Sequence, residues 1–451
     1  MSEALRAARA PVDRDALIAH LAAGCTPRED WRIGVEHEKF VRTAGSLAPL
    51  PYAGSTGMAD VLEALTAHGW RSTASHTGRP LALARGGATV ALEPGGQLEH
   101  AAAPEADLHA VAAALAAHAS ELAQVCDGLD LALLAIGFEP LHAAAAMPWM
   151  PHERFAIMRR YMPRVGRHGC DMMQRTASIQ VSIDYADEAD MVRKFRAALA
   201  LQPLVVALTA SSPYCDGVQT GYQSFRSHVW RATDGARCGL PAFVFEDGMG
   251  FERYVDWALS VPMYSIVRNG HHLDTAGLSF RDFLAGCLPG LPGAHPCLAD
   301  WAVHLPTLLP EVRLKQVLEL RGADSGPVPM VMAVAALWTG LLYDDDALGA
   351  TLELVEGWSQ AERETLARDA ATHGLAAPVN GRDLRALARQ LLALAHTALA
   401  RRGILDGARR DETIHLVPLR EVVERNRAPA AGMLAAGGAQ EAARATAARG
   451  L

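Results

Sequence analysis

The stretch Ile33-Gly-Val-Glu-His-Glu-Lys-Phe40 decides the fold, because its apolar and polar residues alternate as in a half-buried β-strand. Side chains two residues apart in a strand share a face, so Glu36 and Glu38 project together while Ile33 and Val35 face the apolar side. Adjacent carboxylates repel each other unless a cation lies between them, and hard oxygen ligands suit Mg²⁺ or Mn²⁺. A solvated face of an edge strand has the same pattern, so a metal site and a surface strand both stay open at this point.

Further acids occur in two other segments. Glu93 and Glu99 bracket Pro94-Gly-Gly-Gln-Leu98, where the glycines permit a turn or a close approach of the backbone to a ligand. Glu319 and Arg321 share one face of a short predicted strand. Taken alone, the first segment is equally compatible with an ordinary turn carrying two surface acids, and the second with a plain ion pair.

Polar residues of other types leave similar alternatives. The alternating segment 179–184 places Gln180, Ser182 and Asp184 on one face, which is either solvated or the floor of a polar cleft. Arg154 and Arg226 lie in loop-rich segments, and arginine is suited to two-pronged recognition of a carboxylate or phosphate. Because the chain has 42 Lys and Arg residues, any single arginine is by default a surface charge.

The order of elements along the chain favours an α+β fold. Hydrophobic periodicity predicts helices at 13–25, 58–68, 106–127, 188–208, 222–230, 252–259, 280–285, 330–342, 361–369 and 383–402, and strands at 31–40, 81–84, 89–93, 131–138, 179–184 and 318–321. The strands are separated irregularly and several have one polar face, which argues against a regular βαβ winding. No linker-like run divides the chain, so residues 1–451 are predicted to form a single domain, with a loosely ordered Ala/Gly/Arg-rich tail after about residue 428.

Composition excludes several classes of protein. The chain has 451 residues, of which 50% are hydrophobic, and its formal net charge is 42 − 50 = −8, so it is neither disordered nor a basic nucleic-acid binder. Seven scattered cysteines without a C-x-x-C pair are typical of a reducing cytoplasm. Residues 1–14 lack the apolar core of a signal peptide, and no apolar run reaches the roughly 18 residues that a membrane span needs. We therefore expect a cytoplasmic protein without nucleic-acid or membrane partners, and the sequence leaves its oligomeric state open.

In chain order, these and other segments match one known family. The sequence resembles glutamate–cysteine ligase of the plant and proteobacterial type over residues 30–425. The matching segments are Ile33-Gly-Val-Glu-His-Glu-Lys-Phe40, Leu92-Glu-Pro-Gly-Gly-Gln-Leu-Glu99, Ile157-Met-Arg-Arg-Tyr-Met-Pro163, Asp171-Met-Met-Gln-Arg-Thr176, Lys194-Phe-Arg-Ala-Ala-Leu-Ala-Leu-Gln-Pro203, Arg226-Ser-His-Val-Trp230, Val261-Pro-Met-Tyr264, Pro310-Glu-Val-Arg-Leu-Lys315, Leu318-Glu-Leu-Arg-Gly-Ala-Asp324 and Gly340-Leu-Leu-Tyr-Asp344.

The resemblance implies a glutamine-synthetase-like ligase fold, in which a curved, mostly antiparallel sheet forms a cup with helices packed outside. It also implies an enzyme that uses ATP and Mg²⁺ to join glutamate to cysteine through a γ-glutamyl phosphate, the first step of glutathione synthesis. By match of motif, the metal carboxylates would be Glu36, Glu38, Glu93, Glu99 and Glu319, with Gln180 nearby. Arg321 would neutralise phosphate charge, Arg154 and Arg226 would hold substrate carboxylate, and Tyr264 would border the acceptor pocket. The resemblance thus implies that Arg321 and Arg226 are catalytic and that Gln180 also binds substrate.

The chemistry of this reaction agrees with the residues. A carboxylate is a poor acylating agent, so ATP must first convert it to an acyl phosphate that an amine can attack. Negative charge then gathers at the γ-phosphate and the carboxylate, which divalent ions and an arginine stabilise. Five converging acids need such cations in turn.

The chain also departs from the family pattern. Relatives usually have Lys-Gly where this chain has His152-Glu153, a more polar segment at 142–146, Arg-Thr-Cys-Thr in place of Arg175-Thr-Ala-Ser178, and Gly-Pro-Trp in place of Gly326-Pro-Val328. Two alternatives to glutamate–cysteine ligase therefore stay open: the same activation of glutamate with a different amine acceptor, and a catalytically silent relative that binds glutamate or nucleotide. The paired cysteines that act as redox switches in plant members match no motif here.

Overall fold

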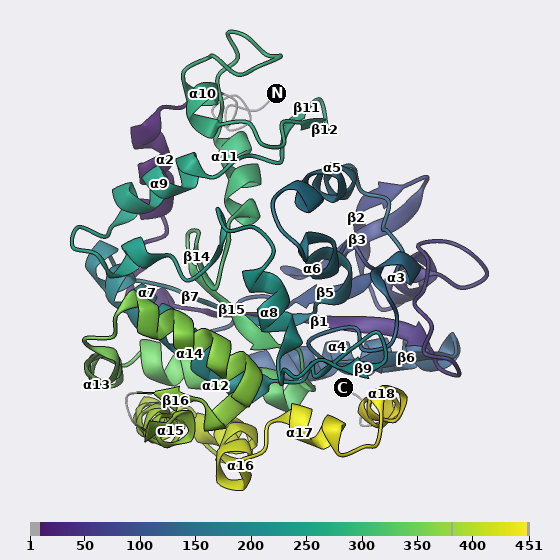
Figure 1. The fold of residues 1–451 in the computed structure, drawn as a ribbon, viewed down its shortest axis with the longest axis vertical. Coiled ribbons are helices and arrows are strands. Elements are labelled where there is room, and N and C mark those ends of the chain that lie inside the picture. Colours follow the sequence, from purple (N-terminus) through teal and green to yellow (C-terminus); the bar gives the residue numbers. More distant parts are fainter. Residues whose placement is uncertain (1–9, 380–381, 449–451) are drawn as a thin grey trace.

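The computed structural model describes residues 10–379 and 382–448, and a nine-stranded antiparallel sheet runs through its centre (Figure 1). Eight strands follow one another across this sheet in the order β14-β15-β7-β1-β5-β4-β3-β2, and β6 pairs with the far half of β1. Their bounds are β1 Ile33–Thr43, β2 Arg71–His76, β3 Arg79–Arg85, β4 Ala88–Leu92, β5 Gln97–Ala101, β6 Leu131–Leu134, β7 Ser178–Ile183, β14 Val312–Leu314 and β15 Leu318–Asp324.

Strand β1 organises the sheet because it pairs on both edges. Along β7 its Val35 lies opposite Val181 and its Glu36 opposite Gln180, and along β5 its Glu38 lies opposite Glu99. The alternation expected from the sequence is therefore present, with apolar side chains on one face and acids on the other. We call the acid-bearing face the front and the face that carries Val35 the back.

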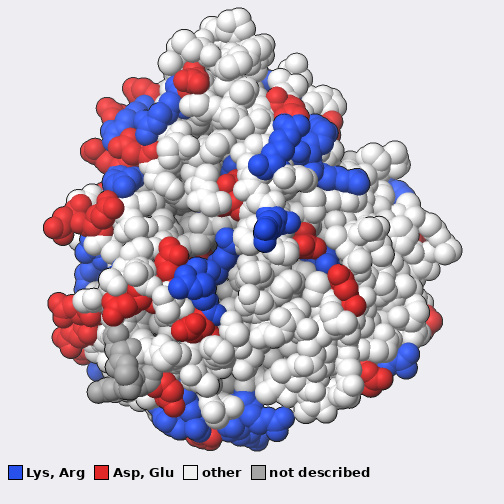
Figure 2. Space-filling model, viewed as in Figure 1, with Lys and Arg blue, Asp and Glu red and all other residues white. Residues whose placement is uncertain are grey.

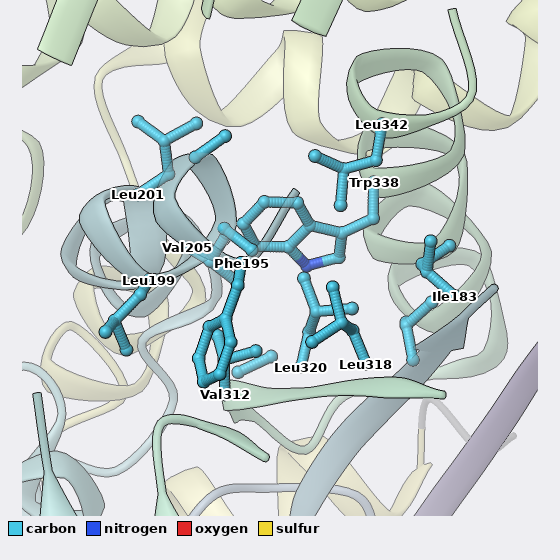
Figure 3. Packing of buried hydrophobic residues seen from close by; sticks show 14 of the residues in the cluster. Ile183, Phe195, Leu199, Leu201, Val205, Val312, Leu318, Leu320, Trp338 and Leu342 are labelled. Carbon is cyan, nitrogen blue, oxygen red and sulfur yellow. The ribbon is translucent and has the colours of Figure 1, made fainter. Parts of the chain in front are cut away.

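The main hydrophobic core lies behind the sheet, between the strands and two long helices, α7 (Glu188–Thr209) and α12 (Val328–Leu342). Figure 3 shows Trp338 of α12 between Phe195 and Val205 of α7 and the strand residues Leu318 and Leu320. Helix α12 is apolar on every side and almost wholly buried, as expected of a helix inside a large core. This core fixes β7 and β15, and thereby the direction in which their front side chains point.

Other helices surround this arrangement. Helices α14 (Gln360–His373) and α15 (Leu384–Arg402) lie on the same side as α12, whereas α5 (Glu153–Tyr161), α6 (Gly169–Arg175) and α8 (Phe225–Arg231) lie on the other side (Figure 1). The remaining helices are α2 Arg14–Ala22, α3 Met58–Thr66, α4 Leu108–Gly128, α9 Phe251–Ser260, α10 Phe280–Leu284, α11 Leu298–His304, α13 Asp345–Val355, α16 Val417–Arg425, α17 Pro429–Leu434 and α18 Ala439–Ala448. Short strand pairs complete the chain: β8 Tyr214–Cys215 with β9 Val218–Gln219, β10 Cys238–Gly239 with β13 Leu309–Pro310, β11 Ser265–Arg268 with β12 His271–Asp274, and β16 Pro378–Val379 with β17 Arg382–Asp383.

The predicted α+β class with an antiparallel sheet and helices outside is confirmed, and the sheet is open rather than closed. The prediction of a loosely ordered tail after residue 428 differs from the structure, which has helices α17 and α18 there. Met433, Ala442 and Ala443 of these helices are buried in one cluster with Phe40 and Leu134, so small apolar residues pack where composition indicated disorder. Residues 1–9, which hold most of the segment without a signal-peptide pattern, lie outside the described part of the chain.

Among the described residues, the helices are too short or too polar to cross a membrane.

Candidate active site

The front face of the sheet forms the floor of a cavity of about 240 Å³. In the space-filling view, charged side chains of both signs surround a hollow near the middle of this side of the molecule (Figure 2). The charged and amide side chains that line the cavity are Glu36, Glu38, Glu93, Gln97, Glu99, Arg154, Gln180, Arg313, Lys315, Glu319 and Arg321. All five predicted acids, Gln180, Arg154 and Arg321 therefore share one cavity.

A tight turn brings Glu93 over the floor. It follows β4 and precedes Gly95, whose backbone lies so close to that of Gln174 that an added Cβ would come within 2.2 Å of the Gln174 carbonyl oxygen. Gly96 has a φ of +81°, which favours glycine. The Gln97 amide accepts from the Gly95 N–H at 2.9 Å and donates to the Thr176 carbonyl at 2.8 Å, so the turn is fixed against the end of α6. The Pro-Gly-Gly sequence thus allows a close approach of backbone to backbone.

Four acids form what we call the acidic bank: Glu36, Glu38, Glu93 and Glu99. Glu38 accepts hydrogen bonds from the Ser178 N–H at 2.6 Å and the Gln180 amide at 3.3 Å. Within the described part of the chain, the carboxylates of the other three receive no hydrogen bond and form no ion pair. These acids lie together in a partly enclosed space and form no ion pair with a described residue.

This arrangement raises the pKa values of all four acids in the acidic bank. Burial, followed by repulsion from Glu93, raises the pKa of Glu38 to about 7. Burial and the charges of its neighbours, Glu36 foremost, hold the pKa of Glu99 well above its ordinary value. Burial likewise raises the pKa of Glu36 and of Glu93. Each shift means that the folded protein disfavours these negative charges unless a cation joins them.

The opposite side of the cavity carries what we call the cationic bank: Arg313, Lys315 and Arg321, which all pair with Glu319. The Glu319 carboxylate lies 2.5 Å from Arg313 Nη2, 2.6 Å from Lys315 Nζ and 2.8 Å from Arg321 Nη1. Although burial opposes ionisation, these three cations hold the pKa of Glu319 far below its ordinary value. Arg321 also donates to the Gln180 amide oxygen. Glu319 is therefore already neutralised, unlike the acidic bank.

The carboxylate oxygens of the acidic bank are of a type that binds divalent cations, although they are not already arranged as a metal site. No group of three or more His, Cys, Asp or Glu side chains among the described residues is already arranged to hold a metal ion. Glu36, Glu93 and Glu99 nevertheless supply carboxylate oxygens that accept from no described residue, and carboxylate oxygens are the ligands that Mg²⁺ prefers. These residues fit a magnesium ion better than Glu319 does.

The predicted substrate residues other than Gln180, which lies on the cavity floor, have different surroundings. Arg154, in the first turn of α5, lines the cavity, and its buried Nε donates to no described protein atom. Arg226 lies one layer behind, is 3% exposed, and donates from Nη2 to the Arg321 carbonyl at 2.9 Å and from Nη1 to the Gly322 carbonyl at 3.1 Å. It holds β15 at a bulge, so its predicted contact with substrate carboxylate stays a prediction.

Tyr264 also lies behind the wall of the cavity rather than in it. Its side chain is 1% exposed, and its hydroxyl approaches the Met162 sulfur at 3.8 Å. Tyr264 belongs to one hydrophobic cluster with Phe155, Met158, Met172, Met173 and Leu309, which also line the cavity, and we call this part of the lining its apolar end. The predicted role of Tyr264 at an acceptor pocket is therefore indirect at most, and stays a prediction.

Sequence reasoning missed two members of the cationic bank. Arg313 and Lys315 are two residues apart on and next to β14, which pairs with β15 so that Arg313 lies opposite Glu319. The same i, i+2 rule that grouped Glu36 with Glu38 groups these two cations. The signal was thus present in Arg313-Leu-Lys315, but the segment is too short to predict as a strand from periodicity.

Comparison with known proteins identifies the family of this chain. The family model "Glutamate-cysteine ligase family 2 (GCS2)" matches residues 32–448. The chain belongs to this family. It is 44% identical over 393 residues to chloroplastic glutamate–cysteine ligase B of Oryza sativa subsp. japonica, covering 87% of this chain and 79% of that protein. It is 45% identical to the chloroplastic enzymes of Brassica juncea and Arabidopsis thaliana, again over 87% of this chain and over 76% and 75% of those proteins.

The fold has a solved counterpart as well. The structure of glutamate–cysteine ligase from Francisella tularensis in complex with AMP superposes with a TM-score of 0.55 at 12% identity, covering 93% of this chain and 88% of that one. Such low identity supports the fold alone. Family membership confirms the sequence prediction of an ATP-dependent glutamate–cysteine ligase that forms γ-glutamylcysteine for glutathione.

The predicted cytoplasmic location is contradicted by these relatives, which are chloroplastic enzymes, and it is not retained. Seven scattered cysteines without a disulfide indicate a reducing environment, but they do not distinguish one reducing compartment from another.

The departures from the family pattern lie outside the cavity lining. Glu153 accepts from the His271 ring and the His272 N–H on β12, at 2.9 Å and 2.8 Å. Ala177 is fully buried, and Val328 begins the core helix α12. None of these three residues lines the cavity. They therefore give no direct reason to expect an altered acceptor.

Proposed function

We propose that this cavity performs the family's ligation with residues divided between its two banks. ATP would phosphorylate the γ-carboxylate of glutamate, and the amine of cysteine would displace the phosphate to give γ-glutamylcysteine. The single observation that carries the proposal is the contrast between the banks. Four acids that pair with no cation in the described part of the chain share a cavity with three cations that converge on one carboxylate.

Glu36, Glu38, Glu93 and Glu99 would hold Mg²⁺ in this scheme. Bound Mg²⁺ supplies positive charge that offsets the charge of the phosphates and lets the acids ionise together. The raised pKa values of these acids support the assignment. A bound cation relieves the unfavourable burial and repulsion that raise these pKa values, and this relief favours binding of the cation. Glu319 is left out of this set because three protein cations already neutralise it.

Arg313, Lys315 and Arg321 would stabilise the phosphoryl group during transfer. Positive groups held in place before the reaction cost little reorganisation when charge develops, and they act more strongly in a partly buried site. Glu319 keeps these three side chains together in the resting protein. Arrival of the phosphates would give them a second, more negative partner.

Arg154 would bind the α-carboxylate of glutamate. Its position at the cavity wall and its unpartnered Nε support this role, since a buried N–H without an acceptor has a free-energy cost that a ligand can remove. A guanidinium can also bind a carboxylate through two parallel hydrogen bonds. Glutamate would then extend its γ-carboxylate toward the acidic bank.

The amine of the acceptor would approach from the apolar end of the cavity. There Met158, Met172 and Met173 offer polarisable surface suited to a small side chain such as the thiol of cysteine. The nitrogen lone pair attacks the acyl carbon, the C–O bond to phosphate breaks, and inorganic phosphate leaves. The nitrogen loses its extra proton, and a neutral amide remains.

The test is direct formation of product. Purified protein is incubated with glutamate, cysteine, ATP and Mg²⁺, and γ-glutamylcysteine is measured by mass alongside ADP. We expect equal amounts of both products, and none after chelation of Mg²⁺ with EDTA. ADP release without the dipeptide, or product formation that continues in EDTA, would overturn the proposal.

A further inference from the structure

Arg237 lies outside the cavity but contacts both the Thr307–Leu309 segment of the cavity lining and the segment that carries Tyr264. It directly precedes β10, and its side chain is completely buried. Its Nε donates to Asp234 Oδ2 at 2.6 Å, so the charge is paired with a carboxylate that is itself buried. A buried charge of this kind is costly unless every part of it is used, which makes its other contacts informative.

The first of these contacts is with the cavity wall. Arg237 Nη1 donates to the Thr307 carbonyl at 3.1 Å, and the Arg237 carbonyl accepts from the Leu309 N–H at 2.9 Å. Thr307 and Leu309 both line the cavity. One residue therefore holds this wall by its side chain and its main chain together.

The second contact is with the segment that carries Tyr264. Arg237 Nη2 donates to the Pro262 carbonyl at 2.8 Å, and the guanidinium carbon lies 4.1 Å from the centre of the Tyr264 ring. A cation over an aromatic face is attracted to the ring. Tyr161 of α5 also lies near, with its ring centre 5.9 Å from the guanidinium carbon.

We infer that Arg237 is a positioning residue that fixes the width of the acceptor end of the cavity, by holding the Thr307–Leu309 wall against Pro262 and Tyr264. The inference rests on the proposed function, because it takes the apolar end as the place of the acceptor. It also gives Tyr264 a role that needs no contact with substrate, because its ring packs against the guanidinium of Arg237 and supports it. Only a planar, forked cation can reach Asp234, Thr307 and Pro262 at once, so lysine cannot replace it.

The experiment compares Arg237→Lys with Arg42→Lys. Arg42 is equally buried and pairs with the buried Glu139. Its hydrogen-bond partners Glu139 and Val41 do not line the cavity, so its variant controls for the loss of a buried arginine fork. For each protein, the KM values of cysteine, glutamate and ATP and the thermal midpoint are measured. Arg237→Lys should raise the KM of cysteine at least about fivefold, as expected when the wall that packs against a substrate is displaced.

In that variant the KM values of glutamate and ATP should stay within about twofold, because their groups are held by the two banks and Arg154. Arg42→Lys should lower the thermal midpoint without this selective change. An unchanged KM of cysteine in Arg237→Lys, an equal rise of all three KM values, or the same pattern in Arg42→Lys would overturn the inference.

If Arg237→Lys does not fold, Tyr264→Leu provides the same test, because it removes the ring behind the guanidinium while leaving its hydrogen bonds. The selective rise for cysteine is again expected, and its absence again overturns the inference. Failure of the proposed function looks different: the unaltered protein would then form no γ-glutamylcysteine at all. An active unaltered protein with unaffected variants refutes the positioning role alone.

Discussion

The two banks of the cavity solve the problem of buried charge in opposite ways. In the cationic bank, Glu319 is balanced by Arg313, Lys315 and Arg321, so the protein supplies its own counter-ions. In the acidic bank, three carboxylates have no donor from any described residue, and the pKa of Glu38 rises to about 7. The difference distinguishes Glu319, whose charge the folded protein balances itself, from the acidic bank, whose charges a bound cation would balance. It predicts that the two kinds of acid respond differently to the same substitution.

The largest expected effect is on stability, in Glu319→Gln. The Glu319 side chain is fully buried, and its neutralisation takes from Arg313 and Arg321, whose side chains are 8% and 10% exposed, the carboxylate with which they form ion pairs. We expect the free energy of unfolding in urea to fall by about 3–5 kcal/mol, the cost of leaving buried charge unpaired. Glu63→Gln, which breaks a surface pair with Arg79, is the control and should change stability little. If Glu319→Gln is as stable as this control, the claim that Glu319 is a structural counter-ion, unlike the acidic bank, is wrong.

Glu38→Gln should instead affect the reaction. The amide oxygen of glutamine can still accept from the Ser178 N–H, so the fold should persist. Turnover should fall at least about 100-fold, in line with the loss of a major charge-stabilising group. Steady-state rates at saturating substrates measure this, and near-normal turnover would remove Glu38 from the machinery.

The pH dependence of stability sharpens the same comparison. Because the pKa of Glu38 is about 7 in the folded protein and near 4.5 when unfolded, the folded state binds one more proton between these values. Stability without metal should therefore fall as pH rises from about 4.5 to about 7, by on the order of 1–3 kcal/mol. Subtracting the free energy of unfolding of Glu38→Gln from that of the unaltered protein at each pH removes the contribution of the histidines, which both proteins share. This difference should fall as pH rises from about 4.5 to about 7. A difference that rises over this range, or does not change, would contradict the raised pKa of Glu38.

The smallest expected effect is that of reducing agents. All seven cysteines lack a disulfide, and burial raises the pKa of Cys126 and of Cys238 to about 12. Thiols in this state react slowly, so turnover should change by less than about twofold between dithiothreitol and a mild oxidant. A several-fold change that reverses on re-reduction would show a redox switch.

Much of this site could be predicted from local alternation. Glu36 and Glu38 were grouped by strand periodicity, and Glu93 and Glu99 by the glycine turn between them, because both patterns act over a few residues. Arg313 was missed because its role depends on which strand lies beside β15, which is a property of the sheet. Arg226 and Tyr264 were expected at the cavity but are buried outside its lining. A motif match identifies a residue, but it does not show how deep in the structure its side chain lies.

The most direct test of the central claim is binding of Mn²⁺, as a spectroscopic probe for Mg²⁺, to the resting protein. Water-proton relaxation is measured for the unaltered protein, Glu99→Gln and Glu63→Gln at neutral pH. If the acidic bank is a cation site, the unaltered protein and Glu63→Gln bind Mn²⁺ equally, and Glu99→Gln binds at least about tenfold more weakly, a loss of roughly 1.4 kcal/mol. Equal affinity of all three proteins would contradict the claim that these acids are charges awaiting a divalent ion.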